Sequence, residues 1–132
     1  MIFNEKGKYK LILASRSPRR QQLLSEMGFT FSILEKDFDE SFPPDLKGEE
    51  IAAYISHKKA SSLKNSINND ELIITADTVV WCDGKILGKP ADINEAVKML
   101  KAISGKTHEV ITGVSITSSV KEITFTEITK VT

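Results

Sequence analysis

Leu72-Ile73-Ile74-Thr75-Ala76-Asp77-Thr78-Val79-Val80-Trp81-Cys82 is the stretch that decides the fold. It is apolar on both faces, which is typical of a central strand that is covered on both sides. Around it, strand-like and helix-like segments alternate along the 132 residues, which predicts one α/β domain. Asp77 departs from the pattern, because Asp is depleted in strands and a buried carboxylate needs a partner. That partner would be a metal ion or a cationic pocket, unless Asp77 lies at a bulge.

The other elements follow from periodicity and from turn residues. Pro18 fits the first position of a helix, Ser17 fits its N-cap and Gly28 fits its end. Pro43 and Pro44 exclude regular structure from the acidic segment 35–47. We expect strands at 9–14, 29–34, 72–82, 110–116 and 123–131, a hairpin arm at 85–87, and helices at 18–27, 48 to about 67, and 92–104.

Composition narrows the class of protein. The chain has 18 basic and 18 acidic residues, so net charge does not imply a general polyanion-binding surface. Cys82 is the single cysteine, which excludes a disulfide within the chain, favours a reducing compartment and predicts a cytoplasmic location. It lies in an apolar run and fits a small core residue. We see no segment typical of a signal peptide or a membrane span, and expect no membrane partner.

Charge is nevertheless uneven along the chain. Residues 6–20 hold six basic residues and no acidic one, whereas residues 35–50 hold seven acidic residues and two lysines. These runs are either two solvated surfaces or an anion cradle that faces a metal-binding acidic loop. Nucleic-acid binding by the basic run is poorly supported, because Tyr9 is its only aromatic residue and a stacking platform needs more.

The turn Ser15-Arg16-Ser17-Pro18-Arg19-Arg20 is a candidate anion site. A helix N-terminus carries free N–H groups and partial positive charge, so Arg19 and Arg20 are unfavourable in the first turn unless an anion is present. Ser15 and Ser17 add hydroxyl donors, and a phosphate chain would satisfy all of these groups together. The alternative is a serine N-cap followed by two exposed arginines.

Two neighbouring lysines on the helix from residue 48 are expected to differ. With about 100° of rotation per residue, Lys59 falls near the middle of the apolar stripe, while Lys58 falls outside it. An ammonium on an apolar face either extends to water or meets a bound anion, so Lys59 is a candidate phosphate ligand and Lys58 an ordinary surface lysine. We expect Lys59→Met to leave thermal stability equal or higher, since Met suits an apolar face.

Two other features are weaker. Residues 84–90 resemble a P-loop, but one residue is missing between the glycines and Pro90 replaces the Ser/Thr. Lys89 can still approach a phosphate. His57 and His108 have no metal-ligand spacing and are interpreted as ordinary polar residues.

Six motifs in order resemble the Maf family of septum formation proteins. They are Leu13-Ala14-Ser15-Arg16-Ser17-Pro18-Arg19-Arg20, Phe38-Asp39-Glu40, Lys58-Lys59-Ala60, Ala76-Asp77-Thr78-Val79-Val80, Gly88-Lys89-Pro90 and Thr107-His108-Glu109-Val110-Ile111-Thr112-Gly113-Val114. The resemblance implies an α/β fold with an elongated mixed sheet flanked by helices, similar to the ITPase fold, and an active-site cleft between two lobes. It also implies hydrolysis of nucleoside triphosphates to monophosphate and diphosphate, with Mg²⁺ or Mn²⁺.

The resemblance also implies roles for individual residues. The catalytic residues would be Asp77, Glu40, Lys59 and Lys89, with Glu40 and Asp77 holding the metal and Asp77 acting as the base on water. The substrate-binding residues would be Ser15, Arg19, Arg20 and Thr78, of which Arg19 and Thr78 match positions that the family uses in substrate selection. Asp77-Thr78 resembles the branch that acts on dTTP and UTP. The branch that acts on 7-methyl-GTP usually has Gln after the aspartate and is the alternative, together with nucleotide binding without turnover.

The family pattern continues beyond the position of Thr132. Its next stretch resembles Ala-Gly-Ala-Tyr-Gly-Ile-Gln-Gly, and the glutamine contacts the base. We therefore expect residues 1–132 to form a single Maf-like domain that lacks the C-terminal segment, with an incomplete second lobe, poor nucleotide binding and weak or no turnover. Uncovered strand edges and apolar faces favour self-association, so a homodimer or a larger species is expected.

Overall fold

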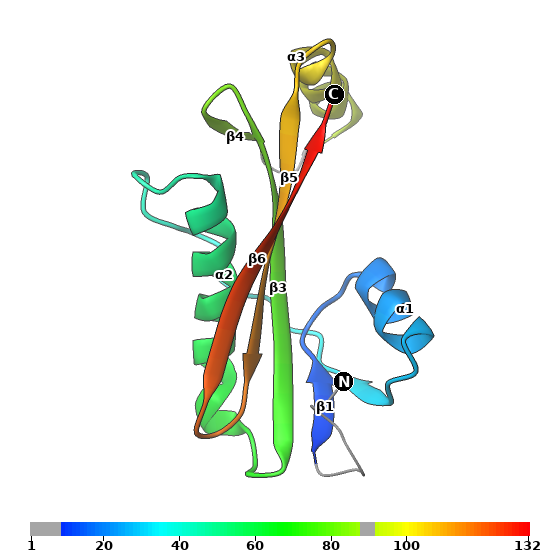
Figure 1. Ribbon diagram of the computed structural model, residues 1–132, viewed down its shortest axis with the longest axis vertical. Coiled ribbons are helices and arrows are strands. Elements are labelled where there is room, and N and C mark those ends of the chain that lie inside the picture. Colours follow the sequence, from blue (N-terminus) through cyan, green and yellow to red (C-terminus); the bar gives the residue numbers. More distant parts are fainter. Residues whose placement is uncertain (1–8, 88–91) are drawn as a thin grey trace.

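The computed structural model describes residues 9–87 and 92–132, and is drawn in Figure 1. The predicted mixed sheet flanked by helices is confirmed, with six strands. The elements are β1 (Lys10–Leu13), α1 (Pro18–Glu26), β2 (Phe31–Ile33), α2 (Gly48–Leu63), a short 3₁₀ helix η2 (Lys64–Ser66), β3 (Glu71–Cys82), β4 (Lys85–Leu87), α3 (Ile93–Ile103), β5 (His108–Thr117) and β6 (Glu122–Val131).

The long strand β3 is the centre of the sheet, as its apolar faces predict. The strand order is β2-β1-β3-β5-β6, and β4 pairs with β3 across the hairpin. β1 is parallel to both β2 and β3, whereas β4 and β5 run antiparallel to β3, and β6 runs antiparallel to β5. The hairpin turn is tight because Asp83 and Gly84 both adopt positive φ, of 53° and 72°.

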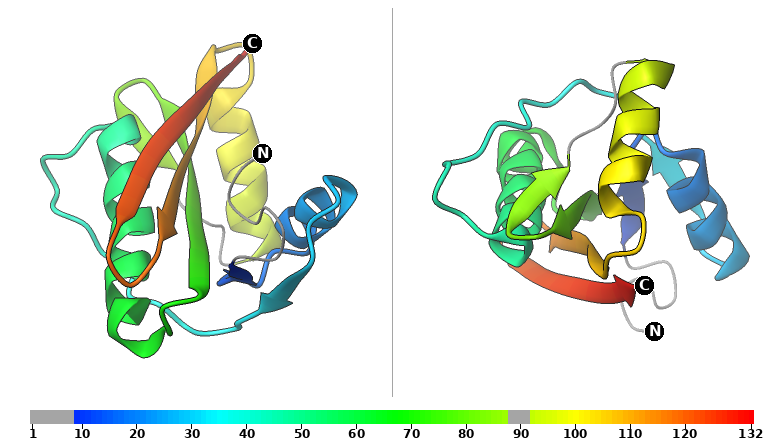
Figure 2. Two further views of the ribbon diagram at one scale, coloured as in Figure 1. Left: turned by 60° about the horizontal axis from the view of Figure 1, so that its bottom comes forward. Right: turned by 90° about the horizontal axis from the view of Figure 1, so that it is seen from above.

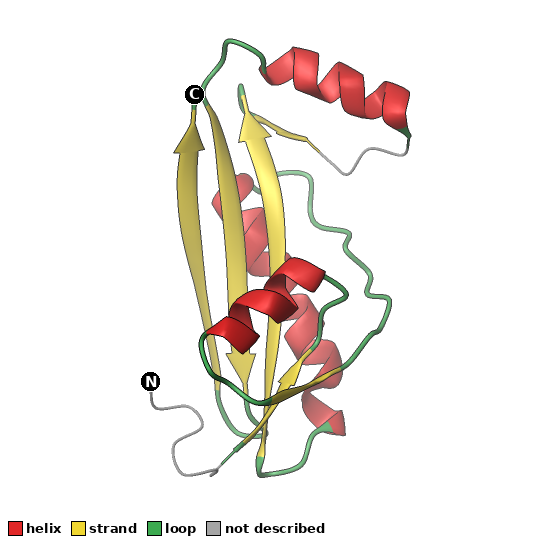
Figure 3. Ribbon diagram, turned by 90° about the vertical axis from the view of Figure 1, so that its right-hand side faces the viewer, coloured by secondary structure: helices red, strands yellow, loops and turns green. Residues whose placement is uncertain are grey.

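The two crossover helices lie on opposite faces of the sheet. Figure 3 shows α1 in front of the strands and α2 behind them, and both views in Figure 2 agree. α1 connects β1 to β2, and α2 lies between β2 and β3 in the chain. The connection that follows β1 therefore crosses one face of the sheet, and the connection that follows its neighbour β2 crosses the other face. The two connections diverge at the carboxyl end of β1. In open α/β sheets such a switch point is where ligands bind.

α2 packs very closely on the sheet through small residues. Ala52 is fully buried against Gly113 of β5, where an added Cβ would overlap the backbone carbonyl group of Ala52. One turn further along α2, Ser56 is fully buried, and its hydroxyl accepts a hydrogen bond from Ser115 at 3.2 Å. The Thr75 hydroxyl donates to the Ser56 carbonyl at 2.8 Å. These contacts hold α2 in one position along β3 and β5, and so place the lysines of its next turn.

Gly113→Ala is expected to lower the free energy of unfolding by about 2–3 kcal/mol, because backbone atoms that cannot rotate away must shift. Urea denaturation measures this change. Gly28→Ala is the matched control, since its φ of +88° is strained for alanine but no atom lies within 4 Å of the added Cβ. The control should cost only about 1 kcal/mol. Equal costs for the two substitutions would show that the helix can move away from the sheet.

Some expected details differ in the structure. α2 ends at Leu63, and the expected last turn is the 3₁₀ helix. The apolar stripe of α3 is largely exposed, with Val97 43% and Leu100 65% accessible. Cys82 is buried, as predicted. In the part of the chain that is described, no helix is both long and apolar enough to cross a membrane.

Candidate active site

A polar pocket of about 390 Å³ lies at the switch point predicted by the topology. β1 ends with Leu13 opposite Ile74, and one further hydrogen bond joins the Ala14 N–H to the Ile74 carbonyl at 3.0 Å. Among the described residues, β3 has no strand partner on that side between Ile74 and Val80, where its pairing with β4 begins, so the turn after β1 lies beside this open stretch of edge. The lining residues are Ala14, Ser15, Arg16, Ser17, Arg20, Lys36, Asp37, Phe38, Glu40 and Lys59.

The turn from Ser15 to Arg20 forms one wall of the pocket. Ser17 is the N-cap of α1 and accepts a hydrogen bond from the Arg20 N–H at 3.3 Å, as predicted. The Ser15 hydroxyl oxygen accepts from the Ser17 N–H at 3.1 Å. No acidic residue lies in the first turn of α1. The N-terminal end of α1 is therefore electropositive, as is typical of helix ends that bind anions.

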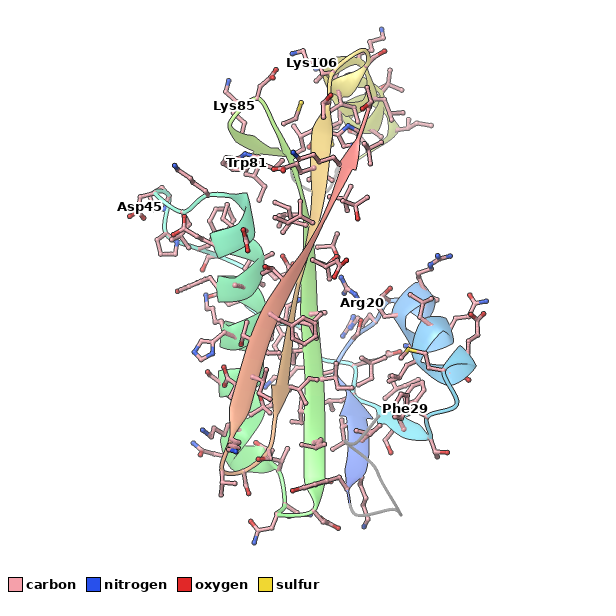
Figure 4. The ribbon with its side chains drawn as sticks, in the orientation of Figure 1. Arg20, Phe29, Asp45, Trp81, Lys85 and Lys106 are labelled. Atoms are coloured by element: carbon pink, nitrogen blue, oxygen red, sulfur yellow. The ribbon has the colours of Figure 1, made fainter. Side chains whose placement is uncertain are left out.

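Arg20 reaches from this turn to the central strand (Figure 4). Its Nη2 donates to the Thr78 hydroxyl at 2.7 Å, and this hydroxyl lies 3.0 Å from the Thr112 hydroxyl on β5. The contact brings together two candidate residues that are 58 positions apart. Arg19 is exposed and does not line the pocket. Thr112 lies in one of the family-like motifs but was not predicted as a site residue. Its place opposite Thr78 depends on the strand register, which local sequence patterns do not reveal.

Lys59 is the buried cation of the site. Its side chain is only 10% exposed, and Nζ lies 2.9 Å from Glu40 Oε2 and 3.6 Å from Asp77 Oδ1. Nζ also donates to the Ala76 carbonyl at 3.1 Å. The ammonium is thus held by two carboxylates and a carbonyl, and does not extend to water. Its position in the apolar stripe of the helix is explained by these partners.

Asp77 is 7% exposed within an unbroken ladder. It pairs with Gly113, and the register between β3 and β5 is regular from Ile73 to Trp81. The bulge that could have explained a strand aspartate is therefore absent from this ladder. Asp77 has the cationic partner that its burial requires, since Lys59 approaches it from α2.

The acidic segment crosses the pocket as a loop, as predicted, and carries Glu40 to Lys59. On one side of Glu40 in the chain, Phe38 packs against the buried cluster of Ala14, Leu63 and Ile73. On the other side, Phe42 packs against a second buried cluster, which includes Ile51, Ile55 and Ile111. Arg16 pairs with Asp37 at 3.2 Å, so the loop is also joined to the turn after β1. Residues of the turn after β1 and residues of the acidic loop therefore line the same pocket.

Lys58 is not the ordinary surface lysine that its place on the helix predicts. Its Nζ donates to Asp39 Oδ2 at 2.9 Å, and to the Ser41 carbonyl at 3.1 Å and hydroxyl at 3.0 Å. Hydrogen bonds from Ser41 and then from Lys58 hold the pKa of Asp39 well below its usual value. The spacing of Asp39 and Ser41, typical of a side-chain-capped turn, was the available signal in the sequence.

The donor set fits a hard divalent cation. Glu40 and Asp77 both approach the same ammonium, so their oxygens converge on one region. Mg²⁺ is usually bound by one or two carboxylates together with phosphate oxygens of a substrate, so two carboxylates suffice. Among the described residues there is no group of three or more His, Cys, Asp or Glu that could hold a metal by itself. Lys89 lies outside the described residues.

Comparison with known proteins points to one family. A family profile described as Maf-like protein matches residues 10–132. The chain is 48% identical over 126 residues to a dTTP/UTP pyrophosphatase of Phocaeicola vulgatus, a match that covers 95% of this chain and 65% of the relative. Proteins of the same name from Bacteroides thetaiotaomicron and Flavobacterium johnsoniae are 49% and 40% identical, with 90% and 100% of this chain and 62% and 68% of the relatives covered. The chain thus spans about two thirds of the length of these curated relatives.

A solved structure supports the fold independently. The structure of the Staphylococcus aureus Ham1 protein is similar to this chain, with a TM-score of 0.57 and 12% sequence identity. The match covers 92% of this chain and 70% of the Ham1 chain. At this identity the likeness concerns the fold alone. It agrees with the expected similarity to the ITPase fold.

Proposed function

The chain belongs to the Maf family, and from this premise we propose that the protein hydrolyses dTTP and UTP to the monophosphate and diphosphate. The observation that carries the proposal is the pocket at the end of β1. There, hydroxyl groups and cations for a triphosphate lie beside two carboxylates that share one lysine. The names of the curated relatives agree with this chemistry.

The proposed roles follow from charge and position. Ser15 and Arg20 bind phosphate oxygens at the N-terminal end of α1, and Lys59 neutralises charge on the triphosphate. Asp77 accepts a proton from the attacking water, and the water oxygen forms a bond to the α-phosphorus as the bond to the leaving diphosphate breaks. Glu40 and Asp77 would hold Mg²⁺ or Mn²⁺, which when bound would neutralise phosphate charge. Lys89 is proposed as a further phosphate ligand on the basis of the family motif.

The pyrimidine preference is proposed from Thr78. Its hydroxyl is bound to Arg20, so the same contact joins the phosphate-binding turn to a position that the family uses in substrate selection. Arg19, the other such position, is exposed beside it. We also propose a cytoplasmic location, since the single cysteine is buried and free. A role in septum formation and a homodimeric state are proposals that rest on the family and on the exposed apolar residues of β6.

A diphosphate-release screen tests the function. The purified protein is assayed with dTTP, UTP, 7-methyl-GTP and the common nucleoside triphosphates, each with Mg²⁺, Mn²⁺ or EDTA. We expect diphosphate and monophosphate from dTTP and UTP, and no release in EDTA. Orthophosphate with nucleoside diphosphate would contradict the reaction. A preference for 7-methyl-GTP would contradict only the substrate, and nucleotide binding without release would indicate a binding protein.

A further inference from the structure

Two consecutive lysines of α2 contact three consecutive residues of the acidic loop. Lys59 binds the Glu40 carboxylate, while Lys58 binds Asp39 and Ser41, the residues before and after Glu40. The Ser41 N–H also donates to Asp39 Oδ1 at 3.0 Å, which closes a small turn around Glu40. Among the described residues, every hydrogen bond that Lys58 donates thus goes to the turn that presents Glu40.

The packing of the loop by itself does not set the direction of the Glu40 side chain. Phe38 and Phe42 pack against the core and hold the loop at two places. Between them, Asp39, Glu40 and Ser41 are exposed, so apolar burial does not determine which way Glu40 points. Directional hydrogen bonds determine it instead, and Lys58 supplies three of them.

We propose that Lys58 is a positioning residue, which holds the turn 39–41 so that the Glu40 carboxylate meets Lys59 and Asp77. It does not line the pocket and acts on the reaction only through Glu40. The catalytic consequence rests on the proposed pyrophosphatase function, whereas the hold on the turn does not.

The energetics favour a local role over a general one. Asp39 is 69% and Lys58 31% exposed in their side chains, and exposed ion pairs of this kind contribute little to the stability of the whole fold. Losing Lys58 should therefore loosen the turn without unfolding the protein.

The experiment compares Lys58→Met with Lys106→Met as a matched control. Lys106 also forms an exposed ion pair, with Asp83 at 2.6 Å, but lies at the far end of the sheet from Arg20 (Figure 4). Amide exchange of Ser41 by NMR reports on the turn, and steady-state kinetics with dTTP and Mg²⁺ report on Glu40. Lys58→Arg tests for rescue, because arginine keeps the charge and several N–H donors.

In Lys58→Met we expect the Ser41 amide to exchange about 3- to 5-fold faster, as the loss of one surface ion pair implies. We expect kcat to fall about 10-fold, because a displaced catalytic group is costly, while KM for the nucleotide stays within about 2-fold. Both readouts should be unchanged in Lys106→Met and largely restored in Lys58→Arg. All three variants should melt close to the wild type.

Unchanged Ser41 exchange in Lys58→Met overturns the proposal, whatever the kinetics. Faster exchange with unchanged kcat overturns the positioning of Glu40 and leaves only a surface contact. A wild-type whole protein that releases no diphosphate refutes the proposed function instead, and the exchange comparison then still decides whether Lys58 holds the turn.

Discussion

Asp77→Asn is expected to lower the rate of diphosphate release by about 10²–10⁴-fold, the usual cost of losing a general base. Asparagine keeps the shape of the side chain but cannot accept a proton from water or supply a charged oxygen to a metal. The fold should persist, because Lys59 keeps its contacts with Glu40 and the Ala76 carbonyl. The rate with saturating dTTP and Mg²⁺ and the midpoint of thermal unfolding measure the two effects separately.

Asp83→Asn is the matched control for this substitution. Asp83 lies in the β3–β4 turn with a φ of 53°, a conformation that asparagine adopts readily, and it is bound to Lys106 outside the pocket. The control should retain normal turnover. Near-normal turnover of Asp77→Asn in the presence of Mg²⁺ would exclude Asp77 as the base.

Lys59→Met is expected to lower the free energy of unfolding by about 3–5 kcal/mol, the cost of removing one partner of a buried ion pair. This reverses the expectation from the sequence, in which methionine suits the apolar face of the helix. The structure shows why: Asp77 is 10% exposed in its side chain and would lose its cationic partner. Glu40, at 39%, can reach water more easily. Chemical denaturation measures the loss.

A double mutant separates charge from packing in this prediction. Asp77→Asn in the Lys59→Met background removes the charge of the buried Asp77 carboxylate, so it should recover much of the lost stability. Lys106→Met, a substitution of the same size at an exposed pair, should leave stability close to that of the wild type. Equal stability of wild type and Lys59→Met would show that Asp77 is adequately held by other groups.

The sequence by itself determined the local elements and the residues that depart from their pattern. The two-sided apolar run placed β3 at the centre of the sheet, and Ser17 and Pro18 began α1 where the structure has it. Lys59 and Asp77 were identified as anomalies because each violates the pattern of its own element. Patterns of this kind involve residues that are close in the chain, because within one helix or strand the backbone geometry alone sets which side chains share a face.

Only the tertiary structure decided which of these exceptional residues come into contact. That Arg20 binds Thr78, and that Thr78 stands beside Thr112, follows from the strand order and from the β3–β5 register. The contacts of Lys58 were missed for the same reason. A helical wheel shows which side chains of a helix point away from the core, but not which loop packs against those side chains. The exposed stripe of α3 is a further case, because amphipathic spacing states what a helix can bury and not what covers it. Strand register, the path of each connection and the surface that covers each helix are all set by close packing between segments that are distant in the chain. The contact of Gly113 with Ala52 is one example, and no local sequence pattern contains this information.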